Sequence, residues 1–314
     1  MVRLNIDVNK VNLFYKEIEE KIVGRIDNSV FLDANQKDGL KNVLETIIKT
    51  QPEDLLSINN EYLNEYFPNL IGEQYNNYLQ SNKAERAQPH FTTIKQEYEE
   101  VIRIFDYKNI VSPYYYLADL LGVDACVYCN RTYVKTIGKT SDKVCRAEYD
   151  HWLNKSFYPL LALSFYNLVP SCPFCNKLKL DKIFSLDTHF HPYTMENKDV
   201  FKFSYLKKNL KENNVIVVNK ENLDEKNKNL IAIFKLDKLY DAYSATELKE
   251  LLDLRFKYNT NYIDDLINVY FKGKLSEKEI YRMIFGIERD PKDFSKRPFS
   301  KFKNDIIDEL KKIK

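Results

Sequence analysis

The fold is decided by the stretch between two Cys-x-x-Cys pairs, Cys126-Val127-Tyr128-Cys129 and Cys172-Pro173-Phe174-Cys175. One such turn lets two thiolates converge on a single ion, and two turns complete the closed four-cysteine arrangement of structural zinc. We therefore expect Cys126, Cys129, Cys172 and Cys175 to bind Zn²⁺. The alternatives are two separate redox dithiols or buried thiols. Cys145 is left over, and we expect it to be a small core residue.

A second group of polar residues occurs between and just beyond these pairs. Asp150-His151 is followed by Asn167, by Asn176 directly after the second pair, and by Lys179. An Asp-His pair alone is common by chance, but several elements in this order form a specific motif. The motif resembles the HNH endonucleases, a family of ββα-metal nucleases, in particular members with two zinc knuckles. The resemblance covers about 60 residues of the 314.

The resemblance implies a role for each residue. His151 would be the general base that takes a proton from water, which suits a side chain titrating near neutral pH. Asp150 and Asn176 would hold one Mg²⁺ or Mn²⁺ through oxygen atoms, with water and the scissile phosphate completing the shell. Asn167 would bond across the loop after His151 and orient the imidazole.

Three lysines, Lys155, Lys177 and Lys179, are placed to contact phosphates, although each could equally be a solvated surface residue. Asn154 stands where the family often has proline, and we expect it to loosen the loop. His189 and His191 could add a metal ligand, but packing or hydrogen bonding is the stronger expectation beside Pro192.

The predicted fold class is α+β. We expect a zinc-stapled ββα-metal core at residues 112–195, a mostly helical N-terminal region at 1–111 and a mixed, mainly helical C-terminal region at 196–314. Inside the core, alternation predicts a hairpin of 131–134 with 144–149 around Gly138, a strand at 166–169 and a helix at 174–183. Ser112-Pro113 should begin a helix that stops at Gly122.

The flanks contain no catalytic pattern. In the N-terminal region, Leu40, Val43, Leu44, Ile47 and Ile48 form an apolar helical stripe, which indicates intramolecular core rather than a partner-binding face. In the C-terminal region we expect strands at 201–205, 215–218 and 230–234. A capping box at Ser276-Glu277-Lys278-Glu279 should begin a later helix.

The hydropathy and charge of the chain indicate a cellular compartment and a class of binding partner. No apolar run approaches the roughly 20 residues that cross a bilayer, so we expect no membrane association and a reducing cytoplasmic location. Net charge is only +2, but residues 131–182 hold nine Lys or Arg against four Asp or Glu. This local excess favours nucleic acid as the partner.

Three classes of function follow. The first is a metal-dependent endonuclease that hydrolyses phosphodiester bonds, with DNA the first expectation and RNA, including tRNA, the alternative. The second is a non-catalytic zinc-knuckle module that binds nucleic acid or protein. The third, a thiol redox protein, would need a βαβ context that the pattern lacks. The chain also resembles the standalone nuclease of Septu-like antiphage systems, which implies a role in bacterial defence and an ATPase partner.

Overall fold

The computed structural model describes residues 1–111, 115–139, 141–208, 213–258, 260–272 and 274–312. The described residues form many helices and three separate two-stranded antiparallel sheets. The predicted α+β class is therefore confirmed. One cluster of buried apolar side chains includes members of the N-terminal, central and C-terminal regions.

The N-terminal region is helical, as predicted. Its α-helices and 3₁₀ turns are α1 (Val8–Asp27), α2 (Ala34–Lys49), α3 (Leu55–Tyr66), η1 (Pro68–Leu70), α4 (Gly72–Gln80), η2 (Glu85–Ala87), η3 (Pro89–Phe91), α5 (Thr92–Ile104) and α6 (Tyr107–Ile110). Helix α7 (Tyr116–Leu121) follows at the start of the central region. Helix α7 ends at Gly122, which adopts a left-handed conformation as a C-cap. The predicted cap Ser112-Pro113 lies outside the described residues.

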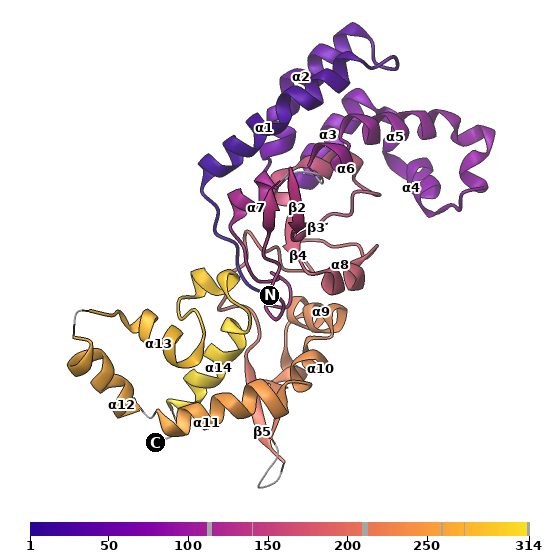
Figure 1. Ribbon diagram of the computed structural model, residues 1–314. Helices are drawn as coiled ribbons and strands as arrows, with labels where there is room; N and C mark the ends of the chain where they lie inside the picture. The colour runs from indigo at the N-terminus through magenta and orange to yellow at the C-terminus, as the bar shows by residue number, and fades with distance from the viewer. Residues whose placement is uncertain (112–114, 140, 209–212, 259, 273, 313–314) are drawn as a thin grey trace.

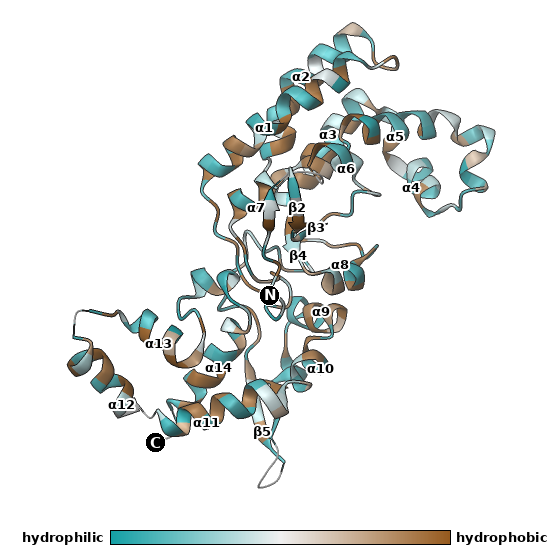
Figure 2. Cartoon of the chain, in the orientation of Figure 1, coloured by the Kyte–Doolittle hydropathy of each residue, from teal (hydrophilic) through white to brown (hydrophobic). Residues whose placement is uncertain are grey.

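The sequence of helix α2 accounts for both where the helix begins and which face it buries. Asp33 and Gln36 form a reciprocal capping box that satisfies two backbone N–H groups at the first turn. The predicted stripe follows, and Leu40, Leu44 and Ile47 have no exposed surface. In Figure 2, α1 and α2 accordingly alternate hydrophobic and hydrophilic residues around the helix. The stripe is intramolecular core.

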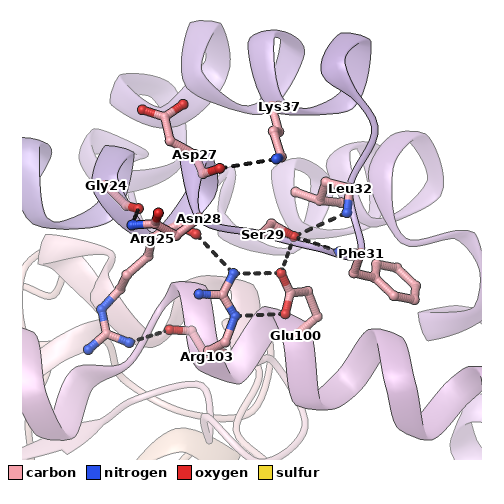
Figure 3. A network of polar contacts seen from close by, with 10 residues as sticks. All are labelled: Gly24, Arg25, Asp27, Asn28, Ser29, Phe31, Leu32, Lys37, Glu100 and Arg103. Carbon is pink, nitrogen blue, oxygen red and sulfur yellow. Dashed lines mark hydrogen bonds and ion pairs between the residues drawn. The ribbon is translucent and has the colours of Figure 1, made fainter.

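A polar network fixes the turn between α1 and α2 against α5 (Figure 3). Glu100 accepts hydrogen bonds from the Arg103 guanidinium, at 2.6 and 2.8 Å, and from the hydroxyl of Ser29. Arg103 also donates to the carbonyl oxygen of Arg25 at 2.9 Å. Because Ser29 and Glu100 are buried, the network satisfies polar groups that would otherwise destabilise this corner.

The central region holds two of the small sheets and a short helix. Strand β1 (Ile137–Lys139) pairs with β2 (Asp142–Cys145), and β3 (Glu148–His151) pairs with β4 (Leu168–Ser171). Two 3₁₀ turns, η4 (Pro159–Leu163) and η5 (Phe165–Asn167), lead into β4, and helix α8 (Pro173–Lys179) follows it. Figure 1 shows β3, β4 and α8 between the N-terminal helices and the C-terminal region.

The predicted hairpin of 131–134 with 144–149 is wrong. The hairpin instead joins 137–139 to 142–145, and Tyr133 makes only an isolated bridge with Ala125. The strand that carries Asp150 and His151 pairs with β4, which is buried along its whole length. A local alternation pattern cannot predict this pairing, because the partner strand is distant in sequence and the pairing is set by burial.

The C-terminal region is mixed. It contains β5 (Phe203–Lys207), β6 (Asn213–Val217), η6 (Lys220–Asn222), α9 (Glu225–Phe234), α10 (Leu236–Asp241), the π-helix η7 (Ser244–Leu248), α11 (Lys249–Lys257), α12 (Thr260–Asp265), the π-helix η8 (Leu266–Tyr270), α13 (Glu277–Phe285), η9 (Pro291–Lys296) and α14 (Ser300–Leu310). Two predicted strands are present as β5 and β6. The capping box at Ser276 and Glu279 is confirmed at the start of α13.

The third predicted strand, 230–234, is wrong because these residues end helix α9. Asp224 caps this helix by accepting a hydrogen bond from the Asn227 backbone N–H at 2.8 Å. Leu230, Ile231 and Phe234 then face the core. A short apolar run fits a buried helix and a buried strand equally well, and the cap several residues earlier decides between them.

The first Cys-x-x-Cys turn joins the central and C-terminal regions. Asn130, with φ +49°, donates its side-chain amide to the carbonyl oxygen of Phe294 at 2.7 Å and accepts from the Lys301 backbone N–H at 3.0 Å. The Tyr240 hydroxyl donates to the carbonyl oxygen of Cys129 at 2.6 Å. Since Asn130 is 1% exposed, these bonds are made away from water.

We predict that Asn130→Ala destabilises the protein by about 2–4 kcal/mol, because it strands two buried backbone groups and puts alanine in a left-handed conformation. Urea unfolding at equilibrium measures this loss. Asn77→Ala, at an exposed position of α4, is the matched control and should change stability by less than about 0.5 kcal/mol. If Asn130→Ala lowers the free energy of unfolding by less than about 1 kcal/mol, Asn130 does not link the central and C-terminal regions as assigned.

Candidate active site

The four predicted cysteines come together. The sulfur atoms of Cys126, Cys129, Cys172 and Cys175 all lie within 4.8 Å of one another, and all four residues are buried. Cys172 precedes α8, so the second pair spans the first turn of that helix. The cluster therefore pins the start of α8 to the turn at 126–129.

This arrangement fits a zinc ion. Four sulfurs at about 2.3 Å from a tetrahedral Zn²⁺ lie about 3.8 Å apart, within the spread observed here. Four buried thiolates packed this closely need a cation among them, because their like charges would otherwise repel one another. The set has no oxygen or water position, which is typical of a structural site. Cys145 is exposed rather than in the core, because it ends the outer hairpin strand β2.

His151 lies at the end of β3 and is 7% exposed. Its Nε2 atom is 3.0 Å from the carbonyl oxygen of Ala162 in η4. Because a carbonyl oxygen only accepts, Nε2 carries the proton and Nδ1 of the neutral ring keeps its lone pair. Tyr107 packs edge-on against the imidazole at 4.6 Å between ring centroids. Burial, with Lys155 nearby, lowers the pKa of His151 to about 3, so the ring is neutral at pH 7.

Asp150, the residue before His151, contacts the first cysteine turn and helix α8. Its carboxylate accepts hydrogen bonds from the Tyr128 hydroxyl at 2.5 Å and from Lys179 Nζ at 3.2 Å. Lys179 also donates to the carbonyl oxygen of His151 at 2.5 Å. Burial raises the pKa of Asp150 and lowers the pKa of Lys179, while their mutual attraction opposes both shifts. The orientation of Asp150 is therefore fixed by a residue of the first cysteine turn and by α8.

Lys179 is not where the sequence suggested. We expected it to contact phosphate, but its side chain is fully buried. The ammonium is close to the Asp150 carboxylate and lies 4.8 Å from the centroid of the Phe184 ring. Helix α8 turns this position inward, and the acid on β3 compensates the buried charge. Lys179 thus stabilises the site from the protein interior, through its bonds to Asp150 and to the His151 carbonyl oxygen.

Asn167 bridges the loop after His151, as the sequence suggested. Its side-chain amide donates to the carbonyl oxygens of Leu153 and Leu161, both at 3.0 Å, and accepts from the Leu153 N–H at 2.7 Å. The side chain is completely buried. Because the loop carries Ala162, which bonds the imidazole, Asn167 and His151 are linked through the same backbone segment.

A groove of about 580 Å³ brings the polar residues together. Its lining includes Asp150, His151 and Asn176. Asn176 donates from Nδ2 to a Glu148 carboxylate oxygen at 2.8 Å, which leaves the amide oxygen Oδ1 as a free acceptor atom. Among the residues that the structure describes, the four cysteines are the only cluster of three or more His, Cys, Asp or Glu ligands.

Sequence reasoning missed two members of this site. Tyr128 lies inside the first cysteine turn, and nothing in the local pattern indicates that its hydroxyl reaches Asp150. Glu148 lies two residues before Asp150 on the same strand, a spacing that places both side chains on one face. This alternation is a signal that could have identified Glu148 once β3 was assigned.

Two of the three lysines do line the groove. Lys155 lies over the Tyr107 ring, with Nζ 5.0 Å from its centroid, and Lys177 extends from the exposed side of α8. Burial lowers the pKa of Lys155. Asn154 does not loosen the loop as expected. Its side chain accepts from the Ser156 N–H at 2.9 Å and donates to the Leu180 carbonyl oxygen at 3.0 Å.

His189 and His191 pack rather than extend a metal site. His189 stacks on Phe184 at 4.1 Å between ring centroids, and its Nδ1 lies 2.8 Å from the Thr188 hydroxyl. His191 is 1% exposed and packs against Trp152 at 4.5 Å. Burial lowers the pKa of His191 to about 3. Both side chains are absent from the cysteine cluster described above.

Comparisons with protein-family models, with curated proteins and with solved structures found no match. The described part of the chain also contains no helix with the length and apolar character required to cross a bilayer.

We predict about one zinc ion per chain, measured by inductively coupled plasma mass spectrometry on purified protein. Cys172→Ser should lose the ion and lower the unfolding temperature, because structural zinc contributes on the order of 10 kcal/mol. Cys145→Ser, at the exposed cysteine, is the matched control and should keep both. Full zinc content in Cys172→Ser would contradict the four-cysteine site.

We predict a pH dependence of stability from His191. The unfolded chain binds a proton at this residue below about pH 6.5, whereas the folded chain does so only near pH 3. The stability that the neutral ring confers is full above pH 6.5 and falls as the pH drops toward 3. Between pH 7 and pH 5 the unfolding free energy should fall by about 2 kcal/mol less in His191→Gln than in wild type. Equal losses would contradict the assigned pKa direction.

Proposed function

We propose that this chain is a metal-dependent endonuclease of the HNH type, which hydrolyses phosphodiester bonds in nucleic acid. One observation carries the proposal. A neutral, buried histidine, held through Nε2 by the carbonyl oxygen of Ala162, lines the same groove as the Asp150 carboxylate and the Asn176 amide. A base with a free nitrogen beside two hard oxygen donors is the set that this hydrolysis requires.

His151 performs the proton transfer. Its Nδ1 atom takes a proton from water, and the ring becomes an imidazolium whose Nε2–H still donates to Ala162. The carbonyl bond thus selects the tautomer before the reaction and stabilises the cation after it. Asn167 keeps the loop that presents Ala162 in place, so it acts through His151 rather than on the substrate.

Asp150 and Asn176 would hold Mg²⁺ or Mn²⁺. When bound, this ion supplies positive charge for the phosphoryl oxygens and for the leaving 3′ oxygen. Two protein ligands are enough, because Mg²⁺ normally keeps several waters and substrate oxygens in its shell. Tyr128 and Lys179 fix the Asp150 carboxylate before any ion arrives, which lowers the entropic cost of binding.

Lys155 and Lys177 lie along the groove and would neutralise phosphates on either side of the scissile bond. Lys179 is too deeply buried to take part. DNA is the proposed substrate, and the role in bacterial antiphage defence and control by an ATPase partner rest on the sequence resemblance. Cleavage of RNA by the same residues is the second candidate. The charge excess at 131–182 supports either polymer.

The test is a paired cleavage assay with supercoiled plasmid and total tRNA, in Mg²⁺, in Mn²⁺ and in EDTA. Wild type should cut one of the two in either metal and neither in EDTA. His151→Ala should lower the rate by at least about 100-fold, which is the contribution typical of a general base. His90→Ala, at an exposed histidine before α5, is the matched control and should cut at the wild-type rate.

Cleavage that persists in EDTA, or that proceeds unchanged in His151→Ala, would overturn the mechanism. If the zinc-loaded chain cuts neither substrate, the catalytic proposal fails for the isolated chain and the zinc-knuckle binding module takes its place.

A further inference from the structure

A second hollow lies next to the candidate active site. It has a volume of about 790 Å³ and is lined by α3, by α4 and by the loop that follows His151. The groove takes its lining from loop residues 154–156, and this cavity takes its lining from residues 157 and 158 of the same loop. Beyond α8, residues 180 and 181 line the groove and Ile183 lines the cavity. The two hollows therefore adjoin.

The N-terminal helices hold this loop in place. The Tyr75 hydroxyl donates to the Phe157 carbonyl oxygen at 3.3 Å, and the Tyr98 hydroxyl donates to the Ser156 carbonyl oxygen at 3.1 Å. Both tyrosines belong to helices, α4 and α5, so the wall shared by the two hollows is fixed to the helical region. The cavity is thus a built feature of the fold.

The lining of the cavity is rich in carboxamides and aromatic rings. The carboxamides are Asn59, Asn60, Asn64, Asn76 and Gln80, and the rings belong to Tyr75, Phe157 and Tyr158. Figure 2 shows α4, one wall of the cavity, in pale and hydrophilic colours. Glu61 is the one charged side chain, and none of the described residues that line the cavity is Lys or Arg. This composition disfavours a phosphate, which requires cations or exposed N–H groups.

Asn59 supplies an independent sign of a ligand. Its side chain is 3% exposed, and its Oδ1 atom has no hydrogen-bond partner among the described residues. The Nδ2 atom of the same amide donates to Asn60 at 3.1 Å. Leaving a buried polar atom unpaired costs about 1–3 kcal/mol. A ligand with an N–H group would recover this energy.

We propose that the cavity is a subsite for one unpaired nucleobase of the substrate strand. A base is neutral, has a polar edge that amides recognise in pairs of hydrogen bonds, and has flat faces that pack on aromatic rings. The cavity can take a base only when that base is out of the duplex. A phosphate or an acidic peptide lacks the required match, because Glu61 is the only charged side chain among the described residues that line the cavity.

The link to cleavage rests on the proposed function. Residues 154 to 158 span at most about 14 Å along the loop, which corresponds to at most about four nucleotides of stacked strand. A base in the cavity therefore comes from the immediate neighbourhood of the phosphate in the groove. The subsite would make the enzyme prefer strands with an unpaired base close to the cut.

Nucleoside binding tests the cavity separately from cleavage. The probes are adenosine, guanosine, cytidine, uridine and thymidine, which carry no phosphate, titrated into the full chain in EDTA by saturation-transfer NMR. At least one should bind wild type. Asn59→Leu and Asn64→Ala should each weaken that binding at least fivefold, and Asn77→Ala, on α4 outside the cavity, should not change it. The exposed Asn64 guards against misfolding, which could occur at buried Asn59.

His151→Ala separates the two proposals, because it should lower the cleavage rate at least about 100-fold and leave nucleoside binding unchanged. If nucleosides bind as predicted but wild type never cuts, the proposed function fails and the base subsite stands. If wild type cuts but binds no nucleoside, or if Asn59→Leu and Asn64→Ala bind as well as wild type, the subsite is overturned and the nuclease stands.

Discussion

The convergence of four buried cysteines is the constraint on which the rest of the structure depends. The cluster joins the turn at 126–129 to the first turn of α8, although residues 130–171 separate them in the chain. The free energy of such a zinc site is on the order of 10 kcal/mol, comparable to the whole net stability of a typical domain. Loss of this cross-link would therefore free the turn at 126–129 and helix α8 at the same time.

Each candidate catalytic group is positioned through an element attached to this cluster. Tyr128, inside the first cysteine turn, reaches Asp150, and α8 supplies Lys179 to the same carboxylate and Asn176 to Glu148. The strand β4 ends where the second cysteine pair begins and pairs with β3, which carries Asp150 and His151. The site consists of short strands and a short helix that would have little stability alone. Packing against the larger regions on either side therefore stabilises it.

The sequence predicted those parts of the site where spacing encodes geometry. Two Cys-x-x-Cys turns can close on one ion wherever the chain between them goes. The loop-bridging bonds of Asn167, by contrast, were expected from the family resemblance. Lys179 was misplaced because the side of a short helix that faces inward depends on what the helix packs against. The 230–234 strand failed for a related reason, since burial without periodicity fits both kinds of element. The cavity beside Asn59 is formed by segments distant in sequence, and no local pattern could have indicated it.

We propose that two different metal sites serve two purposes: a thiolate site stabilises the groove, and an oxygen site in the groove supports hydrolysis. Anomalous diffraction from crystals of His151→Ala, grown with Mn²⁺ and the nucleic acid that wild type cuts, tests it most directly. We expect a zinc peak among Cys126, Cys129, Cys172 and Cys175 and a separate manganese peak at Asp150 and Asn176, against a phosphate. A zinc peak with no manganese in the groove would contradict it.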